Sequence, residues 1–194
     1  MGNEHVDTKQ TLRRRIGAAR ADLPPRLAAE LGAAVCERLL ALPSFRVSRA
    51  VVAYAPVDNE VDPAAAVQAT LAAGKSVYYP RRGADGLEFL ASDPARLAAG
   101  WRAIPEPVGG TPLSVATEGV VFLVPGIAFD PQGVRLGRGA GCYDRALARH
   151  PRAVRLGLAY EMQIVPSLPE AAWDVRMDAV VTEARVLVRK ETSP

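Results

Sequence analysis

The chain has 194 residues, 49% of them hydrophobic and 23% charged, with a formal net charge of +3 at pH 7. This composition is typical of a globular protein and excludes a disordered chain, which has fewer apolar residues and a higher net charge. It also excludes a membrane-spanning helix, because the longest apolar run, 120–129, is too short for a bilayer and contains Pro125 and Gly126.

Helical and strand patterns alternate along the sequence. Leu12, Ile16 and Ala19 lie at helical spacing with arginines between them, which predicts a helix capped by Asp7 or Thr8. Short continuous apolar runs instead predict buried strands. In chain order the predicted elements are helices at 8–20 and 26–42 (ended by Pro43), a strand at 49–54, a helix at 62–73, a strand at 75–79, an irregular region with a small hairpin at 83–117, a strand at 119–124, a glycine-rich loop at 130–141, a helix at 143–149, and strands at 154–159, 179–182 and 186–188.

This alternation predicts the fold class. Strands that alternate with helices are typical of an α/β protein, so we expect a three-layer arrangement of a mostly parallel, twisted sheet with helices on both faces. No repeat, low-complexity linker or charge block divides the sequence. We therefore expect residues 1–194 to form a single domain, with residues 1–7 flexible.

The glycine-rich loop is the clearest candidate site. Gly137, Gly139 and Gly141 alternate with other residues between a predicted strand and a predicted helix. Glycines let backbone N–H groups face a ligand closely, and a helix N-terminus favours an anion such as phosphate. Arg135 and Arg138 can add bidentate contacts to phosphate oxygens. The spacing is neither a P-loop nor a dinucleotide-binding fingerprint, and a plain flexible loop is the alternative.

The sequence in and around this loop resembles the 5-formyltetrahydrofolate cyclo-ligases, also called methenyltetrahydrofolate synthetases. The family pattern is roughly P-G-hydrophobic-x-F-D-x-x-G-x-R-L-G-x-G-x-G-Y-Y-D-R. It is matched by residues 125–130, Gly133 and residues 135–145, and three further family motifs are matched in the expected order at 9–13 (K-x-x-L-R), 59–62 (E-hydrophobic-acid) and 173–183 (D-x-x-x-D-x-x-hydrophobic-T-E). Cys142 departs from the pattern, because it stands where the family usually has an aromatic residue.

The resemblance implies a specific reaction. It is the ATP- and Mg²⁺-dependent conversion of 5-formyltetrahydrofolate to 5,10-methenyltetrahydrofolate, with ADP and phosphate as products. The formyl oxygen is phosphorylated, and ring closure follows. Such chemistry needs positioning and charge neutralisation more than covalent catalysis. The expected cofactors are ATP and Mg²⁺, and the expected partner is a small-molecule folate bound by a monomer, with no nucleic acid and no membrane.

The resemblance assigns the phosphate-binding residues. Lys9 and Arg13 lie one helical turn apart and share a face, which by itself is equally typical of a solvated helix. Arg138 and Tyr143 are expected to be catalytic. The ATP-binding set is Lys9, Arg13, Arg135, Gly137, Arg138, Gly139, Ala140, Gly141, Cys142 and Tyr143.

Folate and metal are expected to contact other side chains. Glu60 follows the first predicted strand, where parallel sheets place ligands, although a surface acid is the alternative. A pterin needs flat apolar faces, so Tyr79, Trp101 and Tyr143 are candidate pocket residues, with core packing as the alternative. The resemblance assigns Mg²⁺ to Asp144 and Asp174, since Mg²⁺ takes oxygen ligands; a helix cap is the other interpretation of Asp144.

Two other functions stay open at this point. The first is a nucleotide-binding relative of the cyclo-ligases with another substrate or none. The second is an arginine-driven nucleic-acid-binding module, favoured by 24 Lys and Arg against 21 Asp and Glu.

The sequence also predicts a location. Cys36 and Cys142 are too few for a disulfide framework, and the N-terminus lacks the apolar segment of a signal peptide, so we expect a cytoplasmic protein.

Overall fold

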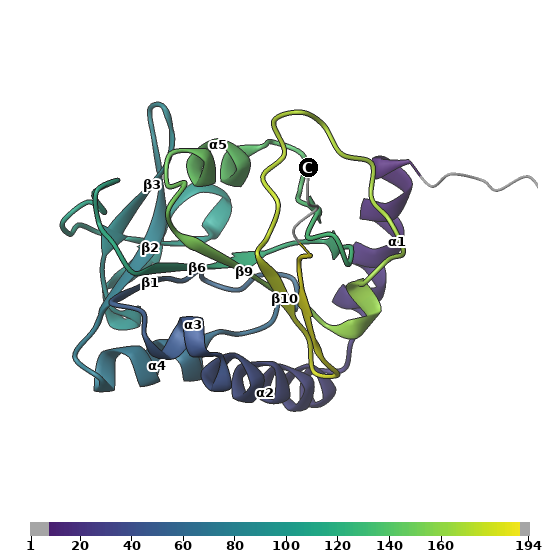
Figure 1. The fold of residues 1–194 in the computed structure, drawn as a ribbon, viewed down its shortest axis with the longest axis horizontal. Helices are drawn as coiled ribbons and strands as arrows, with labels where there is room; N and C mark the ends of the chain where they lie inside the picture. Colours follow the sequence, from purple (N-terminus) through teal and green to yellow (C-terminus); the bar gives the residue numbers. More distant parts are fainter. Residues whose placement is uncertain (1–7, 191–194) are drawn as a thin grey trace, which may run out of the picture.

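The computed structural model describes residues 8–190, and its centre is a seven-stranded sheet in the order β11-β10-β9-β6-β1-β2-β3 (Figure 1). The inner pairings, from β2 through β1, β6 and β9 to β10, are all parallel, and only the edge strands β3 and β11 pair antiparallel. The strands are β1 (Ala50–Val52), β2 (Ser76–Gly83), β3 (Gly86–Ala91), β6 (Val120–Pro125), β9 (Val154–Leu158), β10 (Ala179–Val181) and β11 (Val186–Val188).

Helices cover both faces of this sheet (Figure 1). One face carries α2 (Pro25–Ala41), α3 (Pro43–Arg46) and α4 (Ala64–Ala72), and the other carries α5 (Cys142–Ala148). Helix α1 (Lys9–Ala21) lies beside the sheet and contacts β7 and η3. The predicted three-layer α/β fold is therefore confirmed.

The central strand β6 shows why the sheet is buried on both sides. Side chains of successive strand residues point to opposite faces. Val121 and Leu123 pack in the apolar cluster under α2 and α4, whereas Phe122 and Val124 pack in the cluster under α5. A strand with two buried faces has a continuous apolar sequence rather than an alternating one, which is the pattern of β6.

Short elements occupy the two irregular regions. Strands β4 and β5 form one small antiparallel pair, and β7 and β8 form another inside the segment that contains the glycine-rich loop. These elements are η1 (Pro94–Arg96), β4 (Leu97–Ala99), η2 (Trp101–Ala103), β5 (Pro105–Pro107), β7 (Ala128–Phe129), β8 (Arg135–Leu136) and η3 (Glu161–Gln163).

Several predicted boundaries are wrong for identifiable reasons. Pro43 ends α2 but also begins α3, because proline suits the first position of a helix. Helix α4 begins only after Pro63. Strand β2 continues past the predicted end at residue 79, because it pairs with β3 as far as Gly83. The segment 130–141, predicted as one loop, contains β8.

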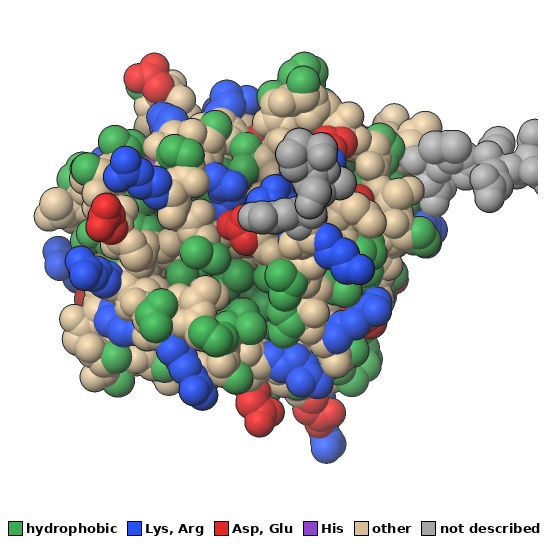
Figure 2. Space-filling view, in the orientation of Figure 1, with side chains coloured by type: hydrophobic (Ala, Val, Ile, Leu, Met, Phe, Trp, Pro, Cys, Tyr) green, Lys and Arg blue, Asp and Glu red, His purple; other side chains and the backbone are tan. Residues whose placement is uncertain are grey.

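Other predictions have different outcomes. Thr8 caps α1, since its side chain accepts a hydrogen bond from the Thr11 N–H, whereas Asp7 and the predicted flexible residues 1–7 lie outside the described part. That residues 1–194 form one domain stays a prediction. No helix between residues 8 and 190 is both long and apolar enough to cross a bilayer. On the face in Figure 2, Lys and Arg side chains are scattered, with Asp and Glu among them.

Candidate active site

A cavity of about 740 Å³ lies at the carboxyl ends of β1 and β6. Tyr54 and Ala55, which follow β1, and Pro125 and Gly126 at the end of β6 belong to its wall. Ligand sites of parallel sheets lie at this end because the loops that leave the strands gather there. Every predicted site residue except Tyr79 lines it, namely Lys9, Arg13, Glu60, Trp101, Arg135, Gly137, Arg138, Gly139, Ala140, Gly141, Cys142, Tyr143, Asp144 and Asp174.

Helix α1 brings two cations to one side of this cavity. The Lys9 ammonium lies 2.9 Å from Oδ2 of Asp174. Arg13, one turn later, donates from Nε to the carbonyl oxygen of Gly137 at 2.8 Å. Burial opposes ionisation of Asp174, but hydrogen bonds from Lys9 and from the Ala171 N–H lower its pKa. The first turns of α1 are therefore attached both to the glycine-rich loop and to the segment before β10.

The glycines of the loop serve different structural purposes. Gly139 has φ 108° and Gly141, the residue that caps α5, has φ 61°, both in the left-handed region that favours glycine. A Cβ at Gly137 would lie 2.6 Å from Nη1 of Arg135. Gly137 thus leaves room for a guanidinium, while Gly139 and Gly141 permit the turn that leads into α5.

Arg135 and Asp144 form a buried ion pair in the cavity wall. Nη2 of Arg135 lies 3.0 Å from both carboxylate oxygens of Asp144, and the Val175 N–H donates to the same carboxylate at 3.3 Å. The two side chains are only 4% and 12% exposed. The Arg135 guanidinium also lies 5.5 Å from the ring centroid of Tyr143. In this arrangement the charge of Arg135 is neutralised by Asp144 rather than free for a phosphate.

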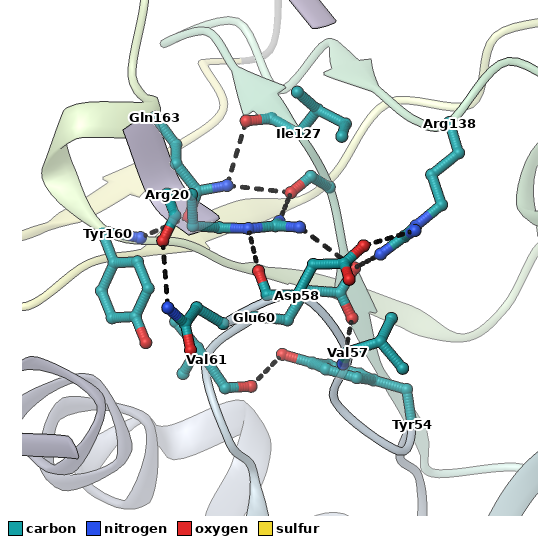
Figure 3. Close-up of polar contacts among 12 residues, drawn as sticks. Arg20, Tyr54, Val57, Asp58, Glu60, Val61, Ile127, Arg138, Tyr160 and Gln163 are labelled. Atoms are coloured by element: carbon teal, nitrogen blue, oxygen red, sulfur yellow. Dashed lines mark hydrogen bonds and ion pairs between the residues drawn. The ribbon is translucent and has the colours of Figure 1, made fainter. Parts of the chain in front are cut away.

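Arg138 bridges the glycine-rich loop to the segment after β1 (Figure 3). Its Nη1 lies 2.9 Å from Oδ2 of Asp58, and its Nη2 lies 3.2 Å from Oε1 of Glu60. Partial burial opposes the charge of Arg138, but these two carboxylates raise its pKa. The Glu60 side chain is 8% exposed, whereas Asp58 is 61% exposed. Glu60 is thus a buried carboxylate at the cavity, and the alternative of a surface acid does not hold.

Aromatic rings border the cavity. The ring of Trp101 contacts two guanidinium groups, 4.6 Å from that of Arg82 and 4.4 Å from that of Arg102, and the residue is 44% exposed. Burial and the nearby Glu60 carboxylate raise the pKa of Tyr143, so its phenol stays protonated at neutral pH. A half-exposed indole and a neutral phenol offer the flat surfaces that a ring system needs.

Tyr79 is not brought to the cavity. It is 4% exposed and packs with Ala53, Val67 and Val77. Side chains alternate along β2, so Tyr79 points to the α4 face while Arg82 reaches the cavity from the other face. The structure therefore favours core packing over the predicted substrate contact.

The two predicted metal ligands are close to cations rather than to other carboxylates. Asp144 is paired with Arg135 and Asp174 with Lys9. Between residues 8 and 190 there is no group of three or more His, Cys, Asp or Glu side chains that could hold a metal ion. Mg²⁺ usually takes one or two carboxylates together with phosphate oxygens and water, so a site made by Asp144 and Asp174 would need such additional ligands.

Sequence reasoning missed four residues of this region. Arg82 and Trp173 line the cavity, Asp58 pairs with Arg138 of its wall, and Arg20 lies behind Glu60. The burial of Arg20 could have been predicted from helical spacing. Arg20 follows Leu12 and Ile16 at intervals of four residues, so it is a charged residue on the buried side of α1. Arg82 was missed because the predicted strand ended before it.

Comparison with known proteins assigns the family. The sequence profile described as the 5-formyltetrahydrofolate cyclo-ligase family matches residues 5–183. The chain belongs to this family. It is accordingly an enzyme of the ligase class, as the resemblance implied.

Relatives of the cyclo-ligase family match most of the chain. The 5-formyltetrahydrofolate cyclo-ligase of Escherichia coli is 33% identical over 177 residues, which cover 86% of this chain and 96% of that one. The enzyme of the same name from Mycolicibacterium smegmatis is 35% identical over 151 residues, 72% of this chain and 76% of that one. These matches support a cyclo-ligase activity.

Solved structures agree with the fold of the cyclo-ligase chain. The 5,10-methenyltetrahydrofolate synthetase of Aquifex aeolicus has a TM-score of 0.82 and 32% identity, covering 96% of this chain and 95% of that one. A synthetase from Mycoplasma pneumoniae has a TM-score of 0.73 over 90% of this chain and 98% of its own; at 23% identity it supports the fold alone.

Proposed function

We propose that this protein converts 5-formyltetrahydrofolate to 5,10-methenyltetrahydrofolate in a reaction that uses ATP and Mg²⁺ and releases ADP and phosphate. One observation carries the proposal. Lys9 and Arg13 lie beside the glycine-rich loop, which carries Arg138, at the same cavity whose wall also holds the buried carboxylate of Glu60. A cavity of about 740 Å³ is within the range of small-molecule sites, roughly 300–1,000 Å³.

The proposed reaction has two chemical steps. The formyl oxygen attacks the terminal phosphorus of ATP, and ADP leaves. The folate nitrogen at position 10 then attacks the activated formyl carbon and loses its proton. Cleavage of the carbon–oxygen bond releases inorganic phosphate, which retains the former formyl oxygen. Most of the barrier is lowered by holding the two substrates in line and by neutralising phosphate charge.

The cationic side of the cavity would bind the nucleotide. Lys9 and Arg13 reach the loop from α1, and the backbone of Gly137, Gly139, Ala140 and Gly141 lines the same wall. Arg138 is 48% exposed, so its side chain can turn toward phosphate oxygens, and the buried Glu60 carboxylate would then keep Arg20 as its cationic neighbour at 3.7 Å. We assign Arg138 the role of stabilising charge on the transferring phosphoryl group, while Arg135 holds Asp144.

Glu60, Trp101 and Tyr143 would bind the folate. The Glu60 carboxylate accepts hydrogen bonds, and a pterin ring carries N–H donors that suit it. Trp101 and Tyr143 supply flat surfaces for the ring, and the protonated phenol of Tyr143 can donate to an oxygen near the reacting formyl group. Cys142 leaves more space at the cavity wall than the usual aromatic residue, and Arg82 and Arg145 point donors at its sulfur from 3.8 Å.

Asp144 and Asp174 would hold Mg²⁺ together with phosphate oxygens. When bound, the metal would neutralise phosphate charge and orient the terminal phosphoryl group. Asp174 is the more available of the two, because its partner Lys9 is 32% exposed and free to turn toward the nucleotide, whereas Asp144 is fixed by buried Arg135.

We further propose that the enzyme acts as a monomer in the cytoplasm, on a small-molecule folate and without nucleic acid or membrane. In support, Cys36 and Cys142 are both free thiols, and Figure 2 shows mixed charges rather than one basic stripe on that face.

The test is an absorbance assay at the methenyl-folate band with 5-formyltetrahydrofolate, Mg²⁺ and ATP, with ATP or Mg²⁺ omitted in turn. We expect a rise that needs both. Arg138→Met should abolish most of it, whereas Arg26→Met should not, because Arg26 is 92% exposed on α2. A flat trace from folded protein that still binds ATP would reject the folate assignment in favour of a nucleotide-binding relative with another substrate.

A further inference from the structure

Arg20 is a buried charge in the last turn of α1, directly behind the cavity. The residue is 2% exposed, although its side chain is one of the largest in the protein. Burial lowers the pKa of Arg20, while the neighbouring Glu60 carboxylate acts in the opposite direction. Burying a guanidinium is costly unless it is fully hydrogen-bonded, so the partners of Arg20 indicate why the charge is there.

The three nitrogens of this guanidinium have three separate partners (Figure 3). Nε donates to the carbonyl oxygen of Asp58 at 3.0 Å, and Nη1 donates to the carbonyl oxygen of Gly126 at 2.9 Å. Nη2 lies 3.7 Å from Oε1 of Glu60. Arg20 therefore connects α1 to the loops at the carboxyl ends of β1 and β6, which form two parts of the cavity wall.

Neighbouring groups reinforce the same junction. The Asn59 side-chain amide donates to the carbonyl oxygens of Arg20, Ala21 and Leu23, which joins the loop after β1 to the end of α1. Asn59 adopts φ 55° and Asp58 φ 51°, a left-handed conformation that needs such support. From the other side, Gln163 donates to the same Gly126 carbonyl oxygen at 2.9 Å.

Glu60 consequently has two different cationic neighbours at Oε1. Arg138 lies 3.2 Å away but is 48% exposed, and it belongs to the loop that would bind phosphate. Arg20 is 2% exposed and does not line the cavity, and its Nη2 lies 3.7 Å from the same oxygen of Glu60. If Arg138 turns to a phosphate, Arg20 is the cation that stays with the Glu60 carboxylate.

We propose that Arg20 is a positioning residue for substrate binding, which holds the Glu60 carboxylate and the 58–60 loop in place while Arg138 engages phosphate. This inference rests on the proposed function, in which Glu60 binds the folate. Lysine cannot replace arginine here, because an ammonium has no planar fork that reaches three separated acceptors.

A change at Arg20 should affect the binding of the folate more than the binding of ATP. Arg20 lies eleven residues after Lys9, about 16 Å along the helix, so nucleotide contacts at the start of α1 are far from it. We expect Arg20→Lys to raise the KM for 5-formyltetrahydrofolate about tenfold or more, with the KM for ATP changed by less than about threefold. The matched control is Arg14→Lys, an exposed arginine on the same helix, which should leave all constants unchanged.

A double-mutant cycle with Glu60→Gln distinguishes positioning from general stability. If Arg20 acts through Glu60, then Arg20→Lys in the Glu60→Gln background should change the folate KM by less than about twofold. If the two effects multiply, or if Arg20→Lys leaves the folate KM at the wild-type value, the proposal is overturned.

Hydrogen exchange provides a measurement that needs neither turnover nor folate. Amide exchange in residues 57–61 should be faster in Arg20→Lys than in the wild type and in Arg14→Lys, with β9 unchanged. Unchanged exchange in that segment, or faster exchange throughout the chain, would reject the positioning role. If the wild-type enzyme forms no methenyl product, the proposed function fails, and hydrogen exchange still decides whether Arg20 fixes the loop.

Discussion

Removing the negative charge from the buried Arg135–Asp144 pair is expected to destabilise the protein strongly. Asp144→Asn keeps the shape of the side chain but leaves the Arg135 guanidinium, which is 4% exposed, without a counter-charge. Breaking a buried pair at one partner costs about 3–5 kcal/mol. For a domain of this size 1 kcal/mol corresponds to roughly 2–4 °C, so even the lower figure lowers Tm by roughly 6–12 °C.

Calorimetry at pH 7 on four proteins would measure this effect. The matched control is Glu170→Gln, because Glu170 and Arg176 form an even shorter pair at 2.6 Å but are 31% and 36% exposed; its cost should be about 1 kcal/mol or less. The double variant Arg135→Met/Asp144→Leu removes both charges and should lose less than Asp144→Asn. If Asp144→Asn shifts Tm no more than Glu170→Gln, the account of Arg135 as a buried holder of Asp144 is refuted.

Three other predictions concern the cavity. The pKa of Asp174 is lowered in the folded protein, so its carboxylate stabilises the fold at pH values above the ordinary aspartate pKa of about 3.9. The Tm difference between the wild type and Asp174→Asn should therefore shrink as the pH falls through and below that pKa. Thermal scans from pH 7 to pH 3 measure this, and a constant difference would contradict it. Tyr79→Phe should leave the folate KM within about twofold, whereas Trp101→Ala should raise it roughly tenfold in steady-state assays; the reverse order would mean that Tyr79 faces the ligand. Gly139→Ala should raise the KM for ATP roughly tenfold, because φ 108° costs an L-residue about 1–3 kcal/mol; unchanged nucleotide binding would show that this turn is not needed.

Much of the fold could be predicted from local pattern. The continuous apolar run of β6 correctly predicted a strand, and the spacing of Leu12 and Ile16 correctly predicted the buried side of α1. Boundaries were wrong where a local signal has two interpretations. Pro43 both ends one helix and starts the next, and the end of β2 depends on pairing with β3, which no short window of sequence contains.

The cavity was predictable in composition but not in pairing. The spacing of Lys9 and Arg13 placed them on one face, and both line the cavity. Arg138 pairs with carboxylates of the loop after β1, which lies about 80 residues earlier in the chain. Local residue spacing cannot predict such a tertiary contact. For Tyr79 the residue type led to a wrong prediction. An aromatic ring favoured a ligand-binding role, but the alternation of side chains along β2 directs this ring into the core.

The most direct test of the central claim follows the formyl oxygen. The wild-type enzyme is supplied with ATP, Mg²⁺ and 5-formyltetrahydrofolate labelled with oxygen-18 in the formyl group, and the released phosphate is analysed by mass spectrometry. If the cavity brings the formyl group to the terminal phosphate of ATP, each methenyl product formed should yield one phosphate that carries the label. Unlabelled phosphate, with the label in water, would contradict phosphorylation of the formyl oxygen and the arrangement of substrates proposed for this cavity.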